Sequence, residues 1–377
     1  MKTALFIALT VFAFRAYANA PNYGIHENYQ SLRALGMGDA FTAVADDDFA
    51  MFYNPAALAK HNGTDLRLFL RGAADQNVIP FYNNLKNAGS DPVQVTNVLN
   101  KYYGDDMYFR PTLGGIFVHR HWSLAILPLD FSNNFDLHSS IAGTPSVFVT
   151  SILDTTVAYA YGHSARMPFH LPGHLYWGYN LRLVHRASYS DVIQSTELAV
   201  NGSKLVDLSN VDEGATVDGD LGLLYDMAEP ADAFFRPSFA LVVRNVGSYG
   251  FVLPVKFFNK SASAPIPYQR VVDFGTKVGL KHFWVFHPKV ALDLRDIGNS
   301  QWTPLKGLHV GAEFYWKMYN WWQGFWSAGV NQGYWTAGFG ARMSVFELEI
   351  ASWGEEEGTT SATEQSRRYA FEMSMNF

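Results

Sequence analysis

The chain has 377 residues, no cysteine and a formal net charge of −6. Aromatic residues make up 16% of it and charged residues 16%, whereas a typical soluble domain has about 25% charged residues. The acidic balance argues against nucleic acid as a partner, and disulfides cannot stabilise the fold. A sparsely charged, aromatic-rich chain of this size favours an outer-membrane β-barrel, in which apolar and polar residues alternate along each strand.

The first residues are typical of a secretory signal peptide. Lys2 precedes an apolar run over residues 3–14, which is too short to span a membrane as a helix, and small residues follow. Two A-x-A cleavage sites overlap, at residues 16–18 and 18–20. The second would leave Pro21 at the new N-terminus, where its missing N–H and fixed φ should fit a protease cleft poorly. We therefore predict a signal peptide over residues 1–18.

Residues 19–63 lack the alternation of a barrel strand. They contain a glycine-rich stretch over residues 35–41, an acidic stretch over residues 45–48 and the sequence FYNPAALA over residues 52–59. Asp48 is expected to cap a short helix that begins near Phe49. Asn54-Pro55 is expected to form a turn or start a helix, because proline holds the preceding residue extended and suits the first helical position.

From residue 64 onward the chain alternates in fourteen segments, an even number as in single-chain bacterial barrels. The predicted strands are 64–73, 107–119, 121–131, 149–162, 174–190, 214–226, 234–247, 268–281, 284–296, 306–318, 320–331, 333–343, 344–354 and 366–377. If the first strand enters from the periplasm, all but one of the external connections are longer than their internal neighbours, as barrels of this kind require. The first external connection is predicted to hold a helix over residues 90–103, which starts at Ser90-Asp91-Pro92.

The two faces of these strands differ in chemistry. Leucines, valines and aromatics occupy one face, and the last strand places Phe371, Met373 and Met375 there. A Lys or Arg at the lipid midplane costs about 2–4 kcal/mol, so the charged face is expected to line the lumen. The predicted lumen residues are Arg67, Arg71, Arg182, Arg186, Arg244, Lys289, Asp293, Arg295, Glu313, Lys317, Glu347, Glu349, Arg368 and Glu372. The alternative is a two-sided soluble sheet whose charges lie in water.

Aromatic residues gather at the predicted periplasmic turns, where amphipathic rings prefer the membrane interface. They are Trp122, Phe234, Phe235, Phe283, Trp284, Tyr319, Trp321, Trp322 and Phe377.

The N-terminal motif resembles the plug of the FadL-like outer-membrane transporter superfamily. Its residues are Gly36, Gly38, Asp39, Asp46, Asp47, Asp48, Asn54 and Pro55. Shorter stretches at 243–247, 311–315 and 329–333 recur in small FadL-like barrels, including PorV-type proteins. The resemblance implies an all-β, 14-stranded antiparallel transmembrane β-barrel over residues 64–377, in the outer membrane of a Gram-negative bacterium. It also implies a plug, or hatch, in the lumen over residues 19–63.

Two features bear on what such a barrel does. The predicted lumen is charged and partly self-compensating, unlike the apolar tunnel of a hydrocarbon channel. Asp39 and Asp46 to Asp48 either pair with lumen arginines, which would pin the plug shut, or are solvated at the periplasmic end; the sequence leaves both open. The aromatic last strand resembles the signal that the barrel-assembly machinery reads, so that machinery is the expected partner during biogenesis, and membrane lipid afterwards.

Residues capable of chemistry form no catalytic arrangement, and the chain is predicted to be neither an enzyme nor a holder of metal or cofactor. His119 and His121 could ligate a metal, but an interfacial position is the better interpretation. The acidic run 355–357 could bind a cation, but a solvated external loop is favoured. The leading functional hypothesis is a barrel that transports or holds hydrophobic molecules or lipids. The alternative is a non-transporting structural protein with a sealed charged lumen, which self-associates into a lipid-contacting homo-oligomer.

Overall fold

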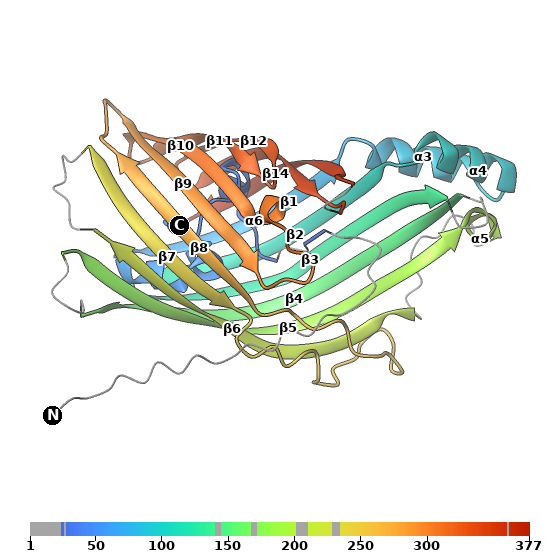
Figure 1. The fold of residues 1–377 in the computed structure, drawn as a ribbon, viewed down its shortest axis with the longest axis horizontal. Helices are drawn as coiled ribbons and strands as arrows, with labels where there is room; N and C mark the ends of the chain where they lie inside the picture. Colours follow the sequence, from blue (N-terminus) through green and yellow to red (C-terminus); the bar gives the residue numbers. More distant parts are fainter. Residues whose placement is uncertain are drawn as a thin grey trace.

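The computed structural model describes residues 24–25, 28–139, 145–166, 172–200, 210–227, 234–359 and 362–377; the predicted signal peptide lies outside them. A single antiparallel sheet of fourteen strands closes into a barrel, in which each strand pairs with its sequence neighbours (Figure 1). The strands are β1 Thr64–Asp75, β2 Asp106–His119, β3 Trp122–Ser139, β4 Pro145–Ala165, β5 His174–Gln194, β6 Asp212–Asp226, β7 Phe235–Arg244, β8 Val271–Leu280, β9 Phe286–Ile297, β10 Leu308–Tyr319, β11 Trp322–Asn331, β12 Tyr334–Met343, β13 Phe346–Glu356 and β14 Gln365–Asn376. The prediction of a 14-stranded antiparallel barrel is confirmed.

The last strand closes the barrel against the first, as predicted. Leu68 lies opposite Met375, and Leu70 lies opposite Met373. Leu66 and Phe377 exchange both backbone hydrogen bonds, each at 3.0 Å. Closure pairs the first strand with the last, so neither is an edge strand, as a β-structure that spans a bilayer requires.

The two faces of the wall sort by chemistry as the alternation predicts. Phe371, Met373 and Met375 are exposed on the outer face of β14, whereas Arg368 and Glu372 are buried inside. The aromatic residues at the short turns are also exposed or partly exposed. A closed barrel with an apolar outer face belongs in the outer membrane of Gram-negative bacteria.

Two ends of the barrel can be distinguished. The turn end carries the two-residue connections 120–121, 320–321 and 344–345, and both Thr64 and Phe377 lie there. The loop end carries the longer connections, including 76–105 and 245–270. It also carries the helices α3 (Val78–Ala88), α4 (Pro92–Lys101) and α5 (Ser195–Val200) (Figure 1).

Strands β3, β4 and β5 are longer than predicted. They have 18, 21 and 21 residues, whereas about 9–11 tilted residues cross a bilayer. The extra length extends beyond the loop end of the other strands. It was missed because residues 132–136 are mostly polar and their sequence is typical of a loop.

Helices α3 (Val78–Ala88), α4 (Pro92–Lys101) and α5 (Ser195–Val200) pack on these extensions. Phe81, Leu85, Val95 and Leu99 form a buried cluster there with side chains of the extended strands. The Asp91 side chain accepts hydrogen bonds from the N–H groups of the first turn of α4, as the predicted helix start requires. α3 was not predicted. No helix in the described part of the chain is long and apolar enough to cross a membrane.

The hydrogen-bonded pairing of neighbouring strands becomes short between β6 and β7. Pairing extends only over residues 221–226 of β6, and β7 ends at Arg244, so strands 234–247 and 268–281 were predicted too long. The free edge of β6 is covered by the connection 245–270, where Leu253 bridges to Ala215. The carboxylate of Glu213 accepts hydrogen bonds from the N–H groups of residues 257, 258 and 259, at 2.6 to 3.1 Å.

Candidate functional site

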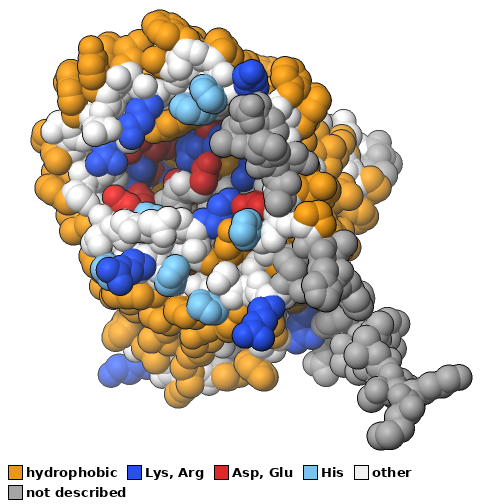
Figure 2. Space-filling model, turned by 90° about the vertical axis from the view of Figure 1, so that its left-hand side faces the viewer, with side chains coloured by type: hydrophobic (Ala, Val, Ile, Leu, Met, Phe, Trp, Pro, Cys, Tyr) orange, Lys and Arg blue, Asp and Glu red, His pale blue; other side chains and the backbone are white. Residues whose placement is uncertain are grey.

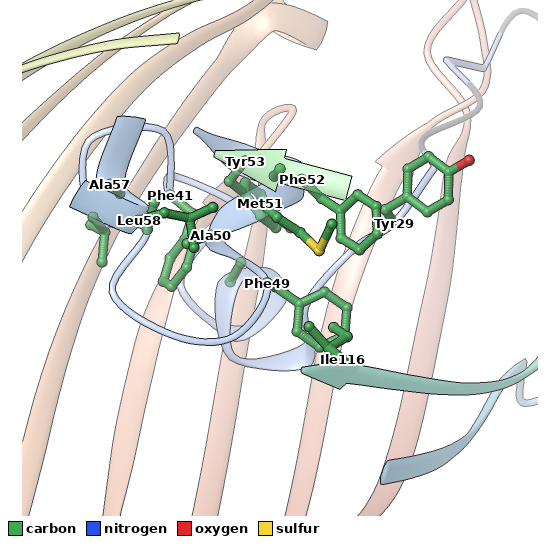
Figure 3. Packing of buried hydrophobic residues seen from close by; sticks show 14 of the residues in the cluster. Tyr29, Phe41, Phe49, Ala50, Met51, Phe52, Tyr53, Ala57, Leu58 and Ile116 are labelled. Atoms are coloured by element: carbon green, nitrogen blue, oxygen red, sulfur yellow. The ribbon is translucent and has the colours of Figure 1, made fainter. Parts of the chain in front are cut away.

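The N-terminal segment, residues 28–63, lies inside the barrel (Figure 3). It contains α1 (Leu32–Gly36), α2 (Ala50–Tyr53) and the 3-10 helix η1 (Pro55–Lys60). Its apolar side chains, aromatic and aliphatic, make up most of a buried cluster that strand residues such as Phe69 and Ile116 complete. Tyr29 stacks on Phe52 with ring centroids 4.5 Å apart, and Phe41 meets Tyr53 edge to face at 5.1 Å.

The local structure follows from two short capping contacts. The side chain of Asn54 accepts a hydrogen bond from Ala56 N at 3.1 Å, and Pro55 occupies the first position of η1, as predicted. The predicted Asp48 cap is wrong. Because α2 starts at Ala50, its N-cap residue is Phe49, whose side chain forms no cap hydrogen bond; Asp47 Oδ1 instead accepts from Phe49 N at 3.0 Å.

Ion pairs join this segment to one side of the wall. Arg33 contacts both carboxylate oxygens of Glu313 on β10, at 2.6 and 2.8 Å. Lys289 on β9 lies 2.6 Å from Asp46 and 3.0 Å from Glu313. Arg295 pairs with Asp39, which also accepts a 2.6 Å hydrogen bond from the Tyr53 hydroxyl. Two of the four acidic residues singled out in this segment, Asp39 and Asp46, therefore pair with cations of the barrel strands.

Side chains from the other strands hold the segment's backbone. Arg71 on β1 donates to the carbonyl of Gln30 at 2.5 Å, and Asn180 on β5 donates to that of Met51 at 2.8 Å. Arg244 on β7 donates to the carbonyls of Phe52 and Tyr53. On β9, Asp293 accepts from Thr42 N at 2.7 Å, and on β12, the Thr336 hydroxyl accepts from Gly38 N at 2.9 Å. The segment is thus bound around the whole barrel.

Glycines explain how closely the segment approaches the wall. Gly38 has a positive φ of 68°, and a Cβ there would overlap the carbonyl of Val310. A Cβ at Gly311 would overlap the carbonyl of Met37, and one at Gly36 would lie 2.5 Å from the Cα of Gly338. The glycine-rich motif and the inward glycines of the barrel therefore form one close backbone contact.

The predicted lumen residues lie mainly on the inner face and in ion pairs. Arg67 contacts Glu347, Glu349 and Glu372, and Arg71 also contacts Glu372. Three predicted cations pair with acids that were not predicted to line the lumen: Arg182 with Asp220, Arg186 with Asp154, and Arg244 with Asp273. Arg110, which was not predicted either, pairs with Asp130. Asp220 could have been found, since it alternates with Leu221 on a predicted strand. Lys317 has the inward parity but is exposed near the turn end of β10, because the barrel opens to water there.

Two cavities flank the segment and share no lining residue. The turn-end cavity has a volume of about 780 Å³ and is lined by Asp46, Asp47, Asp48, Lys60 and other charged side chains. Figure 2 looks into this end and shows acidic and basic side chains in the hollow, histidines around its mouth and hydrophobic side chains on the outer surface. The loop-end cavity has a volume of about 410 Å³. Burial raises the pKa of both Asp47 and Asp48 to about 6.

The acidic run 355–357 is buried, so the prediction of a solvated loop is wrong. Arg368 pairs with Glu355 and Glu357. Glu356 accepts hydrogen bonds from Gly358 N and Glu364 N, at 2.8 and 2.7 Å. The connection after β13 folds onto these carboxylates, which satisfies them internally.

His119 and His121 lie at the turn end. His119 Nδ1 is 2.6 Å from the Thr64 hydroxyl, and the His121 ring lies 6.3 Å from that of His163. Within the described ranges, the one group of three potential metal-binding side chains contains neither histidine.

The fold and its occupied lumen define an outer-membrane β-barrel with an internal N-terminal segment. No protein-family model and no curated protein sequence matches the chain. Among solved structures it is similar to the Ralstonia pickettii toluene transporter TbuX, with 12% identity over 92% of this chain and 98% of that chain and a TM-score of 0.46. It is also similar to the Pseudomonas putida toluene transporter TodX, with 10% identity over 91% and 96% and a TM-score of 0.44.

A Pseudomonas aeruginosa FadL homologue is similar over 94% of this chain and 99% of that chain, with 8% identity and a TM-score of 0.32. These values report a likeness in fold, and they assign neither a family nor a substrate.

Proposed function

We propose that this protein is a closed outer-membrane barrel, in which the N-terminal segment is a fixed plug and the lumen is not an open pore. One observation carries the proposal: the segment is bound to strands around the whole barrel and separates two cavities that share no lining residue. The charges of the lumen side chains are neutralised by ion pairs with one another, so they do not form an open path for a solute. This geometry favours the sealed, non-transporting alternative.

The energetics support a plug that stays in place. Removing one partner of a buried ion pair costs about 3–5 kcal/mol, because a buried charge is left uncompensated. Movement of the segment would break the contacts of Arg33 with Glu313 and of Asp39 with Arg295 together. It would also open the close glycine contact at Gly38 and Gly311.

Single-channel recording in planar bilayers tests this function. The intact protein should show no steady conductance, and deletion of residues 28–60 should produce a stable open channel. A variant with Gly72→Ala, which faces lipid, serves as the control and should resemble the intact protein. Steady conductance of the intact protein would refute a sealed lumen.

A second candidate is the holding or transport of an amphiphilic molecule, favoured by the loop-end cavity. Its lining combines Tyr29, Phe148, Ile152 and Tyr268 with the guanidinium of Arg182. Such a surface suits an apolar body with a polar or anionic head group. Mass spectrometry of co-purified lipids, with fatty-acid uptake into liposomes, tests it. Identical uptake with and without residues 28–60, and no bound lipid, would reject transport.

A closed barrel would act through its outer surface, and one feature there favours self-association. A row of large apolar side chains crosses β10 to β14 in register: Phe314, Trp326, Phe339, Ile350 and Phe371. The row ends beside Gly72 and Pro111, where a Cβ on Gly72 would meet no atom within 4 Å. A large side chain of a second copy could fill this notch.

Native mass spectrometry and cryo-electron microscopy in native lipid test self-association. A ring of sealed barrels that Gly72→Trp dissociates, and Gly72→Ala preserves, would support it. A lone barrel under all conditions would exclude it.

A further inference from the structure

Three carboxylates converge at the loop end of the barrel, away from the N-terminal segment. They belong to Asp106 on β2, Asp136 on β3 and Glu357 in the connection after β13. One oxygen from each lies within 4.8 Å of the other two. The sequence raised Glu357, in the run 355–357, as a possible cation ligand, but it did not place Asp106 or Asp136 beside it, because the register of two strands and the fold of a connection bring the three together.

The pairing of the strands sets up this cluster. Asp106 and Asp136 are direct antiparallel partners on β2 and β3. Like charges directly opposite each other destabilise a sheet. The arrangement therefore opposes folding unless a cation or shared protons offset it.

Asp106 supplies a second and independent observation. Its side chain is buried, with 9% of the residue surface exposed, and its carboxylate faces those of Asp136 and Glu357 with no amide, hydroxyl or cationic donor from the described part of the chain. Most buried polar groups are hydrogen-bonded, and an unsatisfied buried charge is costly. Both oxygens of Asp106 are therefore available to a ligand that comes within the cluster.

Nearby protein cations are already engaged. Arg368 is shared between Glu355 and Glu357 and lies over the ring of Tyr108, 3.8 Å from its centroid. Lys306 donates to the carbonyl of Gly358 at 2.8 Å. These two cations face more carboxylates than they can neutralise, since Asp106 and Asp136 add to the two glutamates.

We propose that Asp106, Asp136 and Glu357 bind a divalent cation, with calcium as the preferred ion. The three oxygens lie within 4.8 Å of one another, a spacing that oxygens bound to one calcium ion at about 2.3–2.6 Å can span. Calcium accepts an irregular shell of about 6–8 oxygen ligands, whereas magnesium demands near-octahedral geometry and keeps several waters. A site whose protein ligands are three carboxylates from separate elements therefore favours calcium.

Asn134 provides a further oxygen near the site. Its Nδ2 donates to both oxygens of Glu357 at 3.1 Å, and its Oδ1 is buried and has no hydrogen-bond partner within the described ranges. Asn134 and Glu357 also line the loop-end cavity, from which water can complete the coordination shell. A bound ion would join the β2–β3 pair to the connection between β13 and β14, across β1, and so hold the wall of that cavity.

Calorimetric titration of the mature chain tests the site. The protein is refolded from inclusion bodies in detergent, so that no lipopolysaccharide carries calcium, and is freed of metal with EDTA. Titration with CaCl2 should show one site per barrel, and MgCl2 should bind at least tenfold more weakly. The variant Asp106→Asn should lower calcium affinity at least tenfold. Asp105→Asn, one residue outside the cluster, is the matched control and should bind as the unmodified chain does.

Thermal unfolding gives a second readout. Calcium should raise the Tm of the unmodified chain and of Asp105→Asn, but not that of Asp106→Asn. If Asp106→Asn does not refold, Glu357→Gln, which changes a connection rather than a strand, replaces it with the same expectation. No calcium binding, or equal binding by the cluster variants, would overturn the proposal. Stabilisation by Asp106→Asn with no effect of calcium would show that shared protons, and not a metal, offset the charges.

Discussion

Arg33 donates from Nε and Nη2 to the two carboxylate oxygens of Glu313, and thereby joins the N-terminal segment to the middle of β10. Glu313 is fully buried and Arg33 nearly so. Lys289 and Asp46 extend the pair into a four-member network of alternating charge. Arg33, Asp46 and Lys289 also line the turn-end cavity, so the segment cannot leave toward that end without breaking this network.

Arg33→Met should release the segment without opening the barrel. Loss of the guanidinium leaves Glu313 with a single cationic partner, and the expected cost is about 3–5 kcal/mol. Limited proteolysis should cut residues 28–63 faster, while the heat-modified mobility of the barrel on gels is unchanged. Lys60→Met is the matched control, since the Lys60–Asp226 pair joins the same segment to β6 but is more exposed, with an expected cost below about 1 kcal/mol. Equal effects of the two variants would contradict this assignment.

Gly311→Ala should displace the segment through volume alone. The new methyl group would overlap the carbonyl of Met37, and overpacking of this kind costs about 1–3 kcal/mol. Proteolysis and Tm measure the loss. Gly72→Ala adds the same methyl group on the lipid face, where it meets no atom within 4 Å, and should change stability by less than about 0.5 kcal/mol.

Asp47 should make the stability of the segment depend on pH. Burial raises its pKa to about 6, so the folded state binds a proton more tightly than the unfolded state. Stability from this group is present below the ordinary carboxylate pKa and is lost as pH rises toward 6. Asp47→Asn should therefore protect the segment at pH 7 and have little effect at pH 4.

Hydrogen exchange of the amides of residues 49–53, corrected for the intrinsic pH dependence, measures this effect. Asp46→Asn is the opposite control: its pKa is lowered by Arg33 and Lys289, so this substitution should weaken the segment at pH 7. Loss of protection in Asp47→Asn at pH 7 would refute the prediction.

Processing of the N-terminus can be checked by intact mass. Exported protein should begin at Asn19, because cleavage after Ala18 avoids a proline at the new terminus. A mature chain that begins at Pro21 would show that the second A-x-A site is used. Uncleaved protein would refute the signal peptide.

Much of the barrel could be predicted because the pattern that identifies each strand lies within that strand. Each membrane strand must turn apolar residues to lipid, so the two-residue period of Phe371, Met373 and Met375 appears in the sequence itself. The outward extension of β3 to β5 has water and helices around it rather than lipid, and its polar residues 132–136 carry no such period. The glycine-rich N-terminal motif could be recognised in the sequence, but the glycines of the wall that it contacts lie on β10 and β12, far along the chain.

The ion-pair partners were harder to predict because they depend on register. Arg182 lies directly opposite Asp218, yet it pairs with Asp220, one inward position further along β6. The acidic run 355–357 has the composition of a solvated loop, and only its contact with Arg368 explains its burial. Pairwise geometry of this kind is set by the whole barrel and not by any one segment.

The tall strands give the molecule a direction within the plane of the membrane. β4 and β5 have 21 residues each, whereas β7 and β8 have ten. The outer end of the barrel is therefore slanted, with a high side that carries α3 to α5 and a low side opposite. In a lateral array of copies, the symmetry would decide whether a high side lies against a low side or against another high side. The pattern of heights on the cell surface would then show how the barrels are oriented.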